Sequence, residues 1–322
     1  MEQFPRPIIY ISKCLGFDHC RYDGQTIESD VVNSLKPYVE FRPVCPEVEI
    51  GLGIPRKPIR IVEIDGQPHL YQPVTGRDCT AEMVAFVEGF LSGITEVDGF
   101  LLKNRSPSCG WQDVKIYPGL ENVSRTLRGA GFYGGEVAKR FEGLPLEDEG
   151  RVRNFTLREH FLTGIFAFAR FRQVKASGVM KDLIEFHTMH KLLLMGYNQA
   201  QMRTLGAILA NKDHCDFSTV ARNYETHLKI ALAKPPRFQA IINVLLHAFG
   251  GFKNVLTSDE KQFFLDTLEE YRDERIPLSA ALKILQVWAI KYHNDYLLNQ
   301  VFMQPSPKAL TEITDSGKGR RL

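Results

Sequence analysis

The sequence lacks the features that mark membrane-spanning, secreted and most zinc-binding proteins. None of its 322 residues belongs to an apolar run near the roughly 20 residues of a membrane span, and the opening "MEQFPRP" lacks the charged and then apolar segments of a secretory signal. It also has no C-x-x-C pair, the spacing typical of zinc sites with cysteine ligands. We therefore expect a cytoplasmic protein with no membrane partner, whose six cysteines are reduced.

The two parts of the chain differ in charge. Residues 1–150 contain 16 Lys and Arg against 22 Asp and Glu, whereas residues 151–322 contain 24 against 16 and seven of the nine His. A basic part hints at a polyanionic partner such as a nucleic acid, although a solvated helical surface can have the same composition. At this length the chain can also form two domains, since single cores stop growing at about 250–300 residues.

Hydrophobic patterns predict an α/β domain followed by an all-α domain. Strands are expected at 7–11, 40–44 and 97–103, helices at 30–39 and 80–94, and a hairpin around Asp65-Gly66. This alternation predicts an open parallel sheet. Beyond the Pro-, Gly- and acid-rich segment 143–155, apolar residues recur at helical spacing to the end. We therefore predict an α/β domain over 1–146, a helical domain over 147–310 and a flexible tail over 311–322.

Three cysteines lie just beyond the carboxyl ends of expected strands: Cys14 in "SKCLG", Cys45 in "CPE" and Cys109 in "SPSCG". In open α/β sheets the loops at that edge converge, so the three thiols should meet in space. Iron–sulfur clusters are held by cysteine thiolates, and three protein ligands leave one iron open. The wide spacing favours a cluster over zinc, although free cysteines are also often simply buried.

The remaining cysteines and one histidine pair give weaker signals. Cys79 and Cys215 each stand alone, so we expect them to be small buried apolar residues. Cys20 lies near Cys14 but across a turn, which makes it a poorer candidate ligand. His187 and His190 are three residues apart on an expected helix with no third ligand nearby, which favours packing or surface roles.

Two polar residues flank the cysteines. Glu47 lies two residues after Cys45, and Ser106 three before Cys109. A carboxylate beside a metal site can act as general base on a water, and a hydroxyl can position that water. Elsewhere the same residues would be a helix cap and a turn serine, but next to three convergent thiols they are candidate catalytic residues.

The motifs "SKCLG...CRYDG", "CPEVEIGLGIPRKPI" and "LLKNRSPSCG" occur in the order found in the thiouracil desulfidase (TudS-like) family, and residues 8–140 resemble that family. The stretch from "EDEGRVRNF" through "HKLLLMGYN" to "YLLNQVF" resembles a helical domain often fused to it, as in the tRNA 4-thiouridine desulfidases (RudS). Lys13 and a single Leu depart from the usual "SACLLG", which should tune the loop without removing a ligand.

The resemblance implies a cofactor, a site and a reaction. The family's 4Fe-4S cluster would be held by Cys14, Cys45 and Cys109, with the open iron binding the thiocarbonyl sulfur of the substrate. The catalytic residues would be Glu47 and Ser106. The implied reaction is a non-redox hydrolysis of 4-thiouridine in tRNA to uridine and hydrosulfide.

Other residues are candidates for substrate and RNA contacts. Ser12 and Ser108 lie beside the thiols, and Arg56 in "IPRKP" could bind the phosphate of an extruded nucleotide, although it could equally be an exposed loop residue. The helical domain is suggested in this family to bind tRNA, which agrees with its charge. The candidate RNA-binding residues are Arg151, Arg153, Arg158, Arg170, Arg172, Lys175, Lys181, Lys191 and Arg203.

Two other functions stay open at this point. The chain could be a desulfidase of free thiouracil whose helical domain serves oligomerisation or stability. It could instead be a non-enzymatic RNA-binding protein whose iron–sulfur cluster senses oxidants. The sequence predicts neither the oligomeric state nor which basic residues contact RNA.

Overall fold

The computed structural model describes residues 4–120 and 126–311. The chain forms two compact units, residues 1–169 with 309–322 and residues 170–308. Because the described residues end at 311, nearly all of the flexible tail expected at 311–322 lies outside them. No helix in these described stretches combines the length and the apolar character that crossing a membrane requires.

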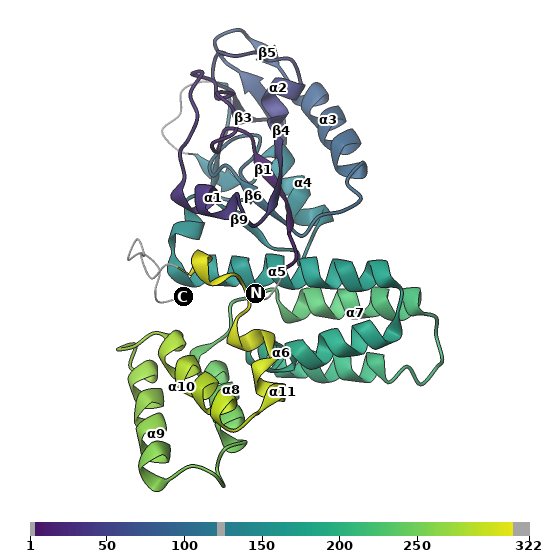
Figure 1. The fold of residues 1–322 in the computed structure, drawn as a ribbon. Coiled ribbons are helices and arrows are strands. Elements are labelled where there is room, and N and C mark those ends of the chain that lie inside the picture. Colours follow the sequence, from purple (N-terminus) through teal and green to yellow (C-terminus); the bar gives the residue numbers. More distant parts are fainter. Residues whose placement is uncertain (1–3, 121–125, 312–322) are drawn as a thin grey trace. The chain divides into compact units, whose positions relative to one another are not determined.

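A four-stranded parallel sheet forms the centre of the first unit (Figure 1). Its strand order is β2-β1-β6-β9, where the strands are β1 (Ile8–Ser12), β2 (Glu40–Val44), β6 (Gly99–Leu102) and β9 (Leu146–Asp148). Every residue of β1 and β6 is buried, as expected for parallel strands covered on both faces. The predicted open parallel sheet is thus confirmed.

Helices cover both faces of this sheet, because successive strand residues point to opposite sides. Ile8 and Tyr10 of β1 join a core with α3 (Thr80–Ser92) and α4 (Phe132–Arg140). Ile9 and Ile11 join a core with α1 (Asp30–Leu35) and α5 (Phe155–Ser177). The helix expected at 30–39 ends early, at Leu35, because Pro37 has no backbone N–H with which to continue the helical hydrogen bonds.

A second sheet has five strands in the order β5-β4-β3-β7-β8. In the sequence, these strands lie between the strands of the first sheet. The predicted hairpin is confirmed: β3 and β4 pair antiparallel, and Asp65 and Gly66 both have positive φ, 50° and 75°. Sequence reasoning missed β5, β7, β8 and β9. The strands are β3 (Arg60–Ile64), β4 (Gln67–Gln72), β5 (Arg77–Asp78), β7 (Val114–Tyr117) and β8 (Leu127–Gly129).

The second unit is helical throughout its described residues, which confirms the predicted all-α domain. Its largest core surrounds Trp288, Phe252 and Phe264. α6 is bent at Asn198, whose φ and ψ of −158° and 94° are not helical. The helices are α6 (Met180–Leu209), α7 (Phe217–Ala231), α8 (Phe238–Gly250), α9 (Ser258–Arg272), α10 (Leu278–Lys291) and α11 (Asp295–Leu298), followed by the 3-10 helix η2 (Val301–Met303). The last 3-10 helix, η3 (Lys308–Leu310), returns the chain to the first unit, where Leu310 joins the core.

The compact units divide within α5, later than the boundary expected at residue 146. β9 completes the parallel sheet, and the 3-10 helix η1 (Arg151–Arg153) follows it directly. Phe161, Ile165 and Phe166 of α5 then pack into the core of the first unit. The segment 143–155 therefore connects elements of one unit, although its composition is that of a linker.

Candidate functional site

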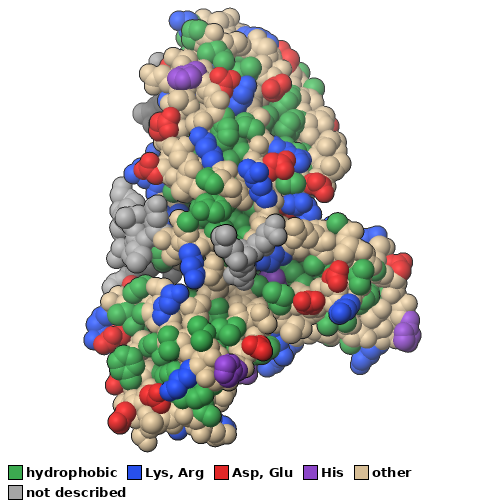
Figure 2. All heavy atoms as spheres, viewed as in Figure 1, with side chains coloured by type: hydrophobic (Ala, Val, Ile, Leu, Met, Phe, Trp, Pro, Cys, Tyr) green, Lys and Arg blue, Asp and Glu red, His purple; other side chains and the backbone are tan. Residues whose placement is uncertain are grey.

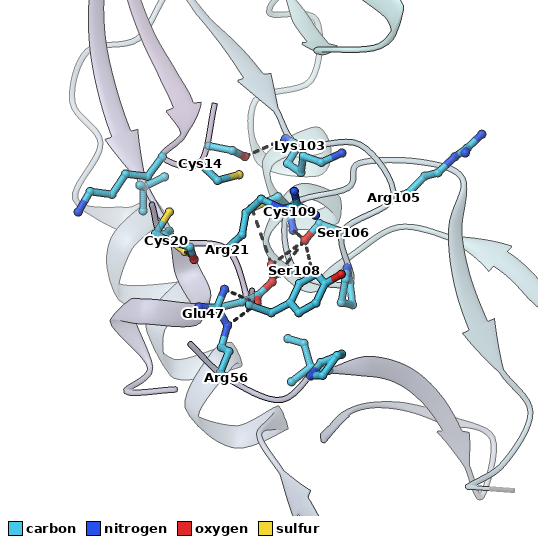
Figure 3. Close-up of a pocket in the computed structure, with 18 of the residues that line it drawn as sticks. Cys14, Cys20, Arg21, Glu47, Arg56, Lys103, Arg105, Ser106, Ser108 and Cys109 are labelled. Carbon is cyan, nitrogen blue, oxygen red and sulfur yellow. Dashed lines mark hydrogen bonds and ion pairs between the residues drawn. The ribbon is translucent and has the colours of Figure 1, made fainter. Parts of the chain in front are cut away.

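A cavity of about 330 Å³ opens at the carboxyl edge of the parallel sheet, entirely within the first unit (Figure 3). Cys14 follows β1, Cys45 follows β2, and Cys109 lies in the loop after β6. Because β1 pairs with both β2 and β6, the loops after these strands must be neighbours. The structure accordingly brings all three thiols to the wall of this one cavity.

Cys20 adds a fourth thiol, which sequence reasoning considered a poor candidate. Its side chain is 1% exposed and is hydrogen-bonded to the thiols of Cys14 and Cys45. The Cys45 thiol also donates to the Cys20 carbonyl at 3.8 Å. The turn between Cys14 and Cys20 therefore folds back, which no periodicity in the sequence reveals.

Three of these thiols, those of Cys20, Cys45 and Cys109, have raised pKa values and are protonated at neutral pH. The hydrogen bond with Cys14, together with burial, raises the pKa of Cys20 to about 11, and the hydrogen bond with Cys20 and burial raise the pKa of Cys45. Burial raises the pKa of Cys109 to about 12. Metal ligation requires thiolates, so metal binding here would displace protons.

The donor set fits an iron–sulfur cluster. No three His, Cys, Asp or Glu side chains of residues 4–120 and 126–311 gather closely enough to hold one metal ion. Cluster ligands bind different irons, so they lie farther apart than the ligands of a single ion. A buried cavity lined by cysteine sulfur and by a single carboxylate also matches the preference of iron–sulfur clusters for thiolates.

Glu47 is the one carboxylate in the cavity wall, and four hydrogen-bond donors surround it. It lies in the first turn of α2 (Pro46–Glu49), which begins directly after Cys45. Its Oε2 accepts from Arg56 Nε at 2.9 Å and Nη2 at 2.7 Å. Its Oε1 accepts from Ser108 Oγ at 2.7 Å and from Ser106 Oγ at 3.5 Å. One carboxylate oxygen is thus held by the Arg56 guanidinium and the other by the two serine hydroxyls.

The two serine hydroxyls form a short chain that ends at this carboxylate. Ser106 Oγ lies 2.9 Å from Ser108 Oγ, and it accepts from the Cys109 backbone N–H at 3.1 Å. The loop that supplies the Cys109 thiol therefore also holds Ser106 in place. Glu47 and Ser106, the two predicted catalytic residues, lie in one hydrogen-bonded group.

The three predicted substrate-binding residues also line the cavity, but each is already engaged. Ser12 Oγ accepts from the Lys103 backbone N–H at 2.8 Å and is 1% exposed. Ser108 is fully buried against Glu47. The Arg56 side chain is 4% exposed and also donates to the Gly53 carbonyl at 3.0 Å. A role of Arg56 through Glu47 is thus favoured over a contact with substrate phosphate.

The predicted RNA-binding residues are scattered. Arg158 is buried, Arg151 pairs with Glu147 at 2.7 Å, and Lys175 pairs with Glu225 at 2.6 Å. On the face in Figure 2, Lys and Arg side chains lie among Asp and Glu rather than in one continuous patch. RNA binding by these residues stays a prediction. Five of the nine are exposed: Arg153, Lys175, Lys181, Lys191 and Arg203.

Sequence reasoning missed four charged or aromatic residues of the cavity wall, all inside motifs that it did use: Arg21, Tyr22, Lys103 and Arg105. Arg21 and Tyr22 belong to the "CRYDG" segment, and Arg105 precedes Ser106 directly. Charged and aromatic residues beside candidate ligands could have been identified in the sequence as candidate site residues. Only the folded loops show that they line the cavity.

Outside the cavity, the structure agrees with the expectations for Cys79 and His190 but not with the one for Cys215. Cys79 is fully buried, as expected. Cys215 was expected to be buried, but it is exposed, because it follows the turn at Asn211 and His214 rather than lying in a core. His190 is buried with its ring stacked on Phe186, and its Nδ1 lies 2.7 Å from the Phe186 carbonyl, which is a packing role.

Comparisons with known proteins match both parts of the chain. Residues 9–149 match the family described as 2-thiouracil desulfurase, and residues 191–307 match one described as a protein of unknown function (DUF1722). The uncharacterized protein YbbK of Bacillus subtilis is 30% identical over 110 residues, which cover 32% of this chain and 73% of that protein. The uncharacterized protein YbgA of Escherichia coli is 24% identical over 151 residues, which cover 46% and 89%.

A solved structure is also similar, that of the [4Fe-4S]-dependent thiouracil desulfidase TudS. It is 30% identical to this chain, and the match covers 46% of this chain and 93% of that one with a TM-score of 0.36. The match to the family model and the similarity to YbbK confirm the expected resemblance to the thiouracil desulfidase family. The chain belongs to the 2-thiouracil desulfurase family, in a form that carries a second domain after the desulfurase part.

Proposed function

We propose that this protein is a desulfidase that hydrolyses the thiocarbonyl of 4-thiouridine in tRNA, giving uridine and hydrosulfide. The observation that carries the proposal is the cavity itself, where Cys14, Cys45 and Cys109 meet the Glu47 and Ser106 side chains. The three cysteines would hold a 4Fe-4S cluster. When bound, such a cluster supplies a soft Lewis acid, which suits a polarizable thiocarbonyl sulfur.

Glu47 is the general base in this proposal. A water that attacks C4 of the pyrimidine must lose a proton, and a carboxylate within hydrogen-bond reach can accept it. Arg56 occupies Oε2 with two N–H groups, so Oε1 is the oxygen that can take the proton. The exchange balances because water supplies the new carbonyl oxygen and both protons, and the sulfur leaves as hydrosulfide with its bonding electrons.

The serine hydroxyls position the water and connect it to the base. Ser106 Oγ lies 2.9 Å from Ser108 Oγ, which donates to Glu47 Oε1 at 2.7 Å. A water bound at Ser106 could therefore pass its proton along two short hydrogen bonds. Since both hydroxyls are held by the Cys109 loop, their geometry is set before substrate arrives.

The charge of the cavity favours a phosphorylated substrate over a free base. Five cationic side chains line it against the single carboxylate of Glu47: Lys13, Arg21, Arg56, Lys103 and Arg105. Each cation has a carboxylate partner, but four of the five partners lie outside the cavity wall, so the wall itself is positive. A nucleotide phosphate can interact with this charge, whereas a neutral thiouracil cannot. In tRNA the base must be extruded to reach the thiols, at a cost of a few kcal/mol that phosphate contacts can offset.

The test is sulfide release from 4-thiouridine-containing tRNA by protein purified without oxygen. Glu47→Gln should abolish release while the iron content stays unchanged. Glu49→Gln is the matched control, because Glu49 lies on the same short helix but is exposed and outside the cavity wall. Equal kcat/KM on free 4-thiouracil and on thiolated tRNA would overturn the RNA part of the proposal, and unchanged activity of Glu47→Gln would overturn the mechanism.

A further inference from the structure

Cys20 is a cavity thiol to which the proposed function gives no role. Its side chain is 1% exposed, and it lies in the cavity wall together with the three candidate ligands. Figure 3 shows it on the same side of the cavity as Cys14, opposite Ser106 and Ser108. Free thiols are often buried only as small apolar groups, so a role for Cys20 has to follow from its contacts.

The contacts of Cys20 are with two of the candidate ligands. Its thiol is hydrogen-bonded to the thiols of Cys14 and Cys45, and the Cys45 thiol also donates to the Cys20 carbonyl at 3.8 Å. Two sulfur ligands of a 4Fe-4S cluster bind different irons, so they lie farther apart than hydrogen-bonded sulfurs. In this position Cys20 is therefore too close to Cys14 and Cys45 to hold the fourth iron, but close enough to donate a hydrogen bond to either.

Cluster binding would change the hydrogen bonds that these sulfurs can make. A ligating cysteine is a thiolate, which accepts hydrogen bonds and donates none. Cys45 could then no longer donate to the Cys20 carbonyl. A thiol that binds no metal keeps its proton at neutral pH, because the ordinary pKa of cysteine is about 8.5. The Cys20 S–H group would thus be a donor beside two acceptors.

The third candidate ligand already has a side-chain donor of this kind. Ser108 Oγ donates to Cys109 Sγ at 3.8 Å. Metal ligands are commonly oriented and tuned by such hydrogen-bonding partners, which bind no metal themselves. Cys20 is placed to be the corresponding donor for Cys14 and Cys45.

The turn that carries Cys20 is anchored at both ends by backbone hydrogen bonds. The Ile27 N–H donates to the Cys14 carbonyl at 2.8 Å, and the Arg21 N–H donates to the Gln25 carbonyl at 3.3 Å. The position of the Cys20 sulfur relative to Cys14 is therefore set by the fold.

We propose that Cys20 is a positioning residue whose thiol donates a hydrogen bond to the ligand thiolates of Cys14 and Cys45, one at a time. The inference rests on the proposed function, because it needs the cluster. A hydrogen bond to a ligand sulfur withdraws electron density from it, which raises the reduction potential of a cluster and makes its irons stronger Lewis acids. Cys20 would thus promote polarisation of the thiocarbonyl without binding metal or substrate itself.

The experiment measures the cluster as well as turnover, in full-length protein purified without oxygen. Cys20→Ala should keep the iron and acid-labile sulfide content of the wild type, because it removes no ligand. Its reduction potential should be lower in a titration followed by electron paramagnetic resonance. The kcat/KM for sulfide release from thiolated tRNA should fall about 10-fold, the low end for a lost partner of a metal ligand, since S–H is a weak donor.

The hydrogen bond should also have a spectroscopic signature. In the reduced cluster, a proton bound to a ligand sulfur couples magnetically to the unpaired electron and is replaced by deuterium in D2O. Electron–nuclear double resonance should show one such coupling in the wild type that is absent in Cys20→Ala. Cys20→Ser keeps a donor and should restore the coupling, the potential and most of the activity.

The matched control is Cys79→Ala. Cys79 is likewise a buried free cysteine of the first unit, but it is outside the cavity wall. This variant should leave the potential, the proton coupling and kcat/KM unchanged.

Three outcomes would overturn the inference. Loss of iron from folded Cys20→Ala would make Cys20 a ligand, and an unchanged potential with an unchanged proton coupling would leave it a packing residue. Equal shifts in Cys79→Ala would assign them to a general loosening of the unit. If the wild type binds iron and acid-labile sulfide but releases no sulfide from any substrate, the proposed function falls while the potential and the coupling still test the inference. If it binds neither, both fall.

Discussion

Replacing Arg56 with Gln distinguishes a residue that serves Glu47 from one that binds substrate. The Arg56 and Glu47 side chains are only 4% and 13% exposed, and two N–H groups meet one carboxylate oxygen at 2.9 and 2.7 Å. Removing one partner of a buried ion pair costs about 3–5 kcal/mol, because the other charge stays uncompensated. Since this pair lines a cavity open to solvent, we expect about 3 kcal/mol.

The same change should lower kcat about 100-fold, because Glu47 loses the two donors that fix its orientation, and misplacement of a catalytic group by about 1 Å can cost that much. The loss should be equal on free 4-thiouracil and on thiolated tRNA. Arg56→Lys should be intermediate, since it keeps the charge but not the paired donors of the guanidinium.

The assay combines urea unfolding of the metal-free protein with steady-state rates. Arg56→Gln, Glu47→Gln and the double variant form a cycle, for which we expect a coupling free energy of about 2 kcal/mol. A loss of activity confined to phosphorylated substrates, with no coupling in the cycle, would refute the reasoning and return Arg56 to the role of a phosphate ligand.

Three further predictions concern the cluster loops and the helical unit. Changing Cys14, Cys45 or Cys109 to Ala should abolish bound iron and acid-labile sulfide in anaerobic preparations. The control Cys215→Ala, in the other unit, should retain both. A full iron content in any of the first three variants would show that the replaced cysteine is not a ligand. Gly134→Ala should cost about 1–3 kcal/mol and lower the iron content, because its Cβ would lie 2.2 Å from the Cys109 carbonyl oxygen. Gly89→Ala, which has open space inside α3, should leave the iron content unchanged and should not lower the free energy of unfolding. Burial lowers the pKa of His190 to about 3 from 6.5, so only the unfolded chain gains this proton between pH 7 and 5, and the free energy of unfolding should fall by about 2 kcal/mol over that range. In urea unfolding, the free energy of unfolding of His190→Asn should lack this decrease between pH 7 and 5. The same pH dependence in the variant and in the wild type would show that the histidine is not buried in its neutral form.

The parallel sheet and the meeting of three cysteines could be predicted because both depend on local patterns. Short apolar runs identify β1, β2 and β6, and adjacent parallel strands place their following loops at one edge. β9 was missed because its sequence "LED" has no apolar pattern, although Glu147 and Asp148 are buried. Its place depends on pairing with β6, a tertiary contact that no window of sequence contains.

The hydrogen bonds of the site could be predicted only in part. Glu47 and Ser106 stood out by their distance from cysteines in the sequence. Arg56 was expected either to bind a phosphate, because it lies close to the cysteine loops, or to be an exposed loop residue, because arginines in loops usually reach solvent. The loop instead turns at Gly51 and Gly53, with φ of 77° and 72°, and returns the guanidinium to the carboxylate. The sequence shows that such a turn is possible, but not where it ends.

One loop, between β1 and α1, supplies thiols as well as cationic and aromatic side chains to the cavity wall. Cys14 and the buried Cys20 contribute thiols, and the partly exposed Arg21 and the exposed Tyr22 follow directly. Because Cys20 and Arg21 are adjacent in the chain, a shift of this turn would move the thiol and the guanidinium together. The positions of the Cys20 thiol and of the Arg21 guanidinium are therefore coupled through this one turn.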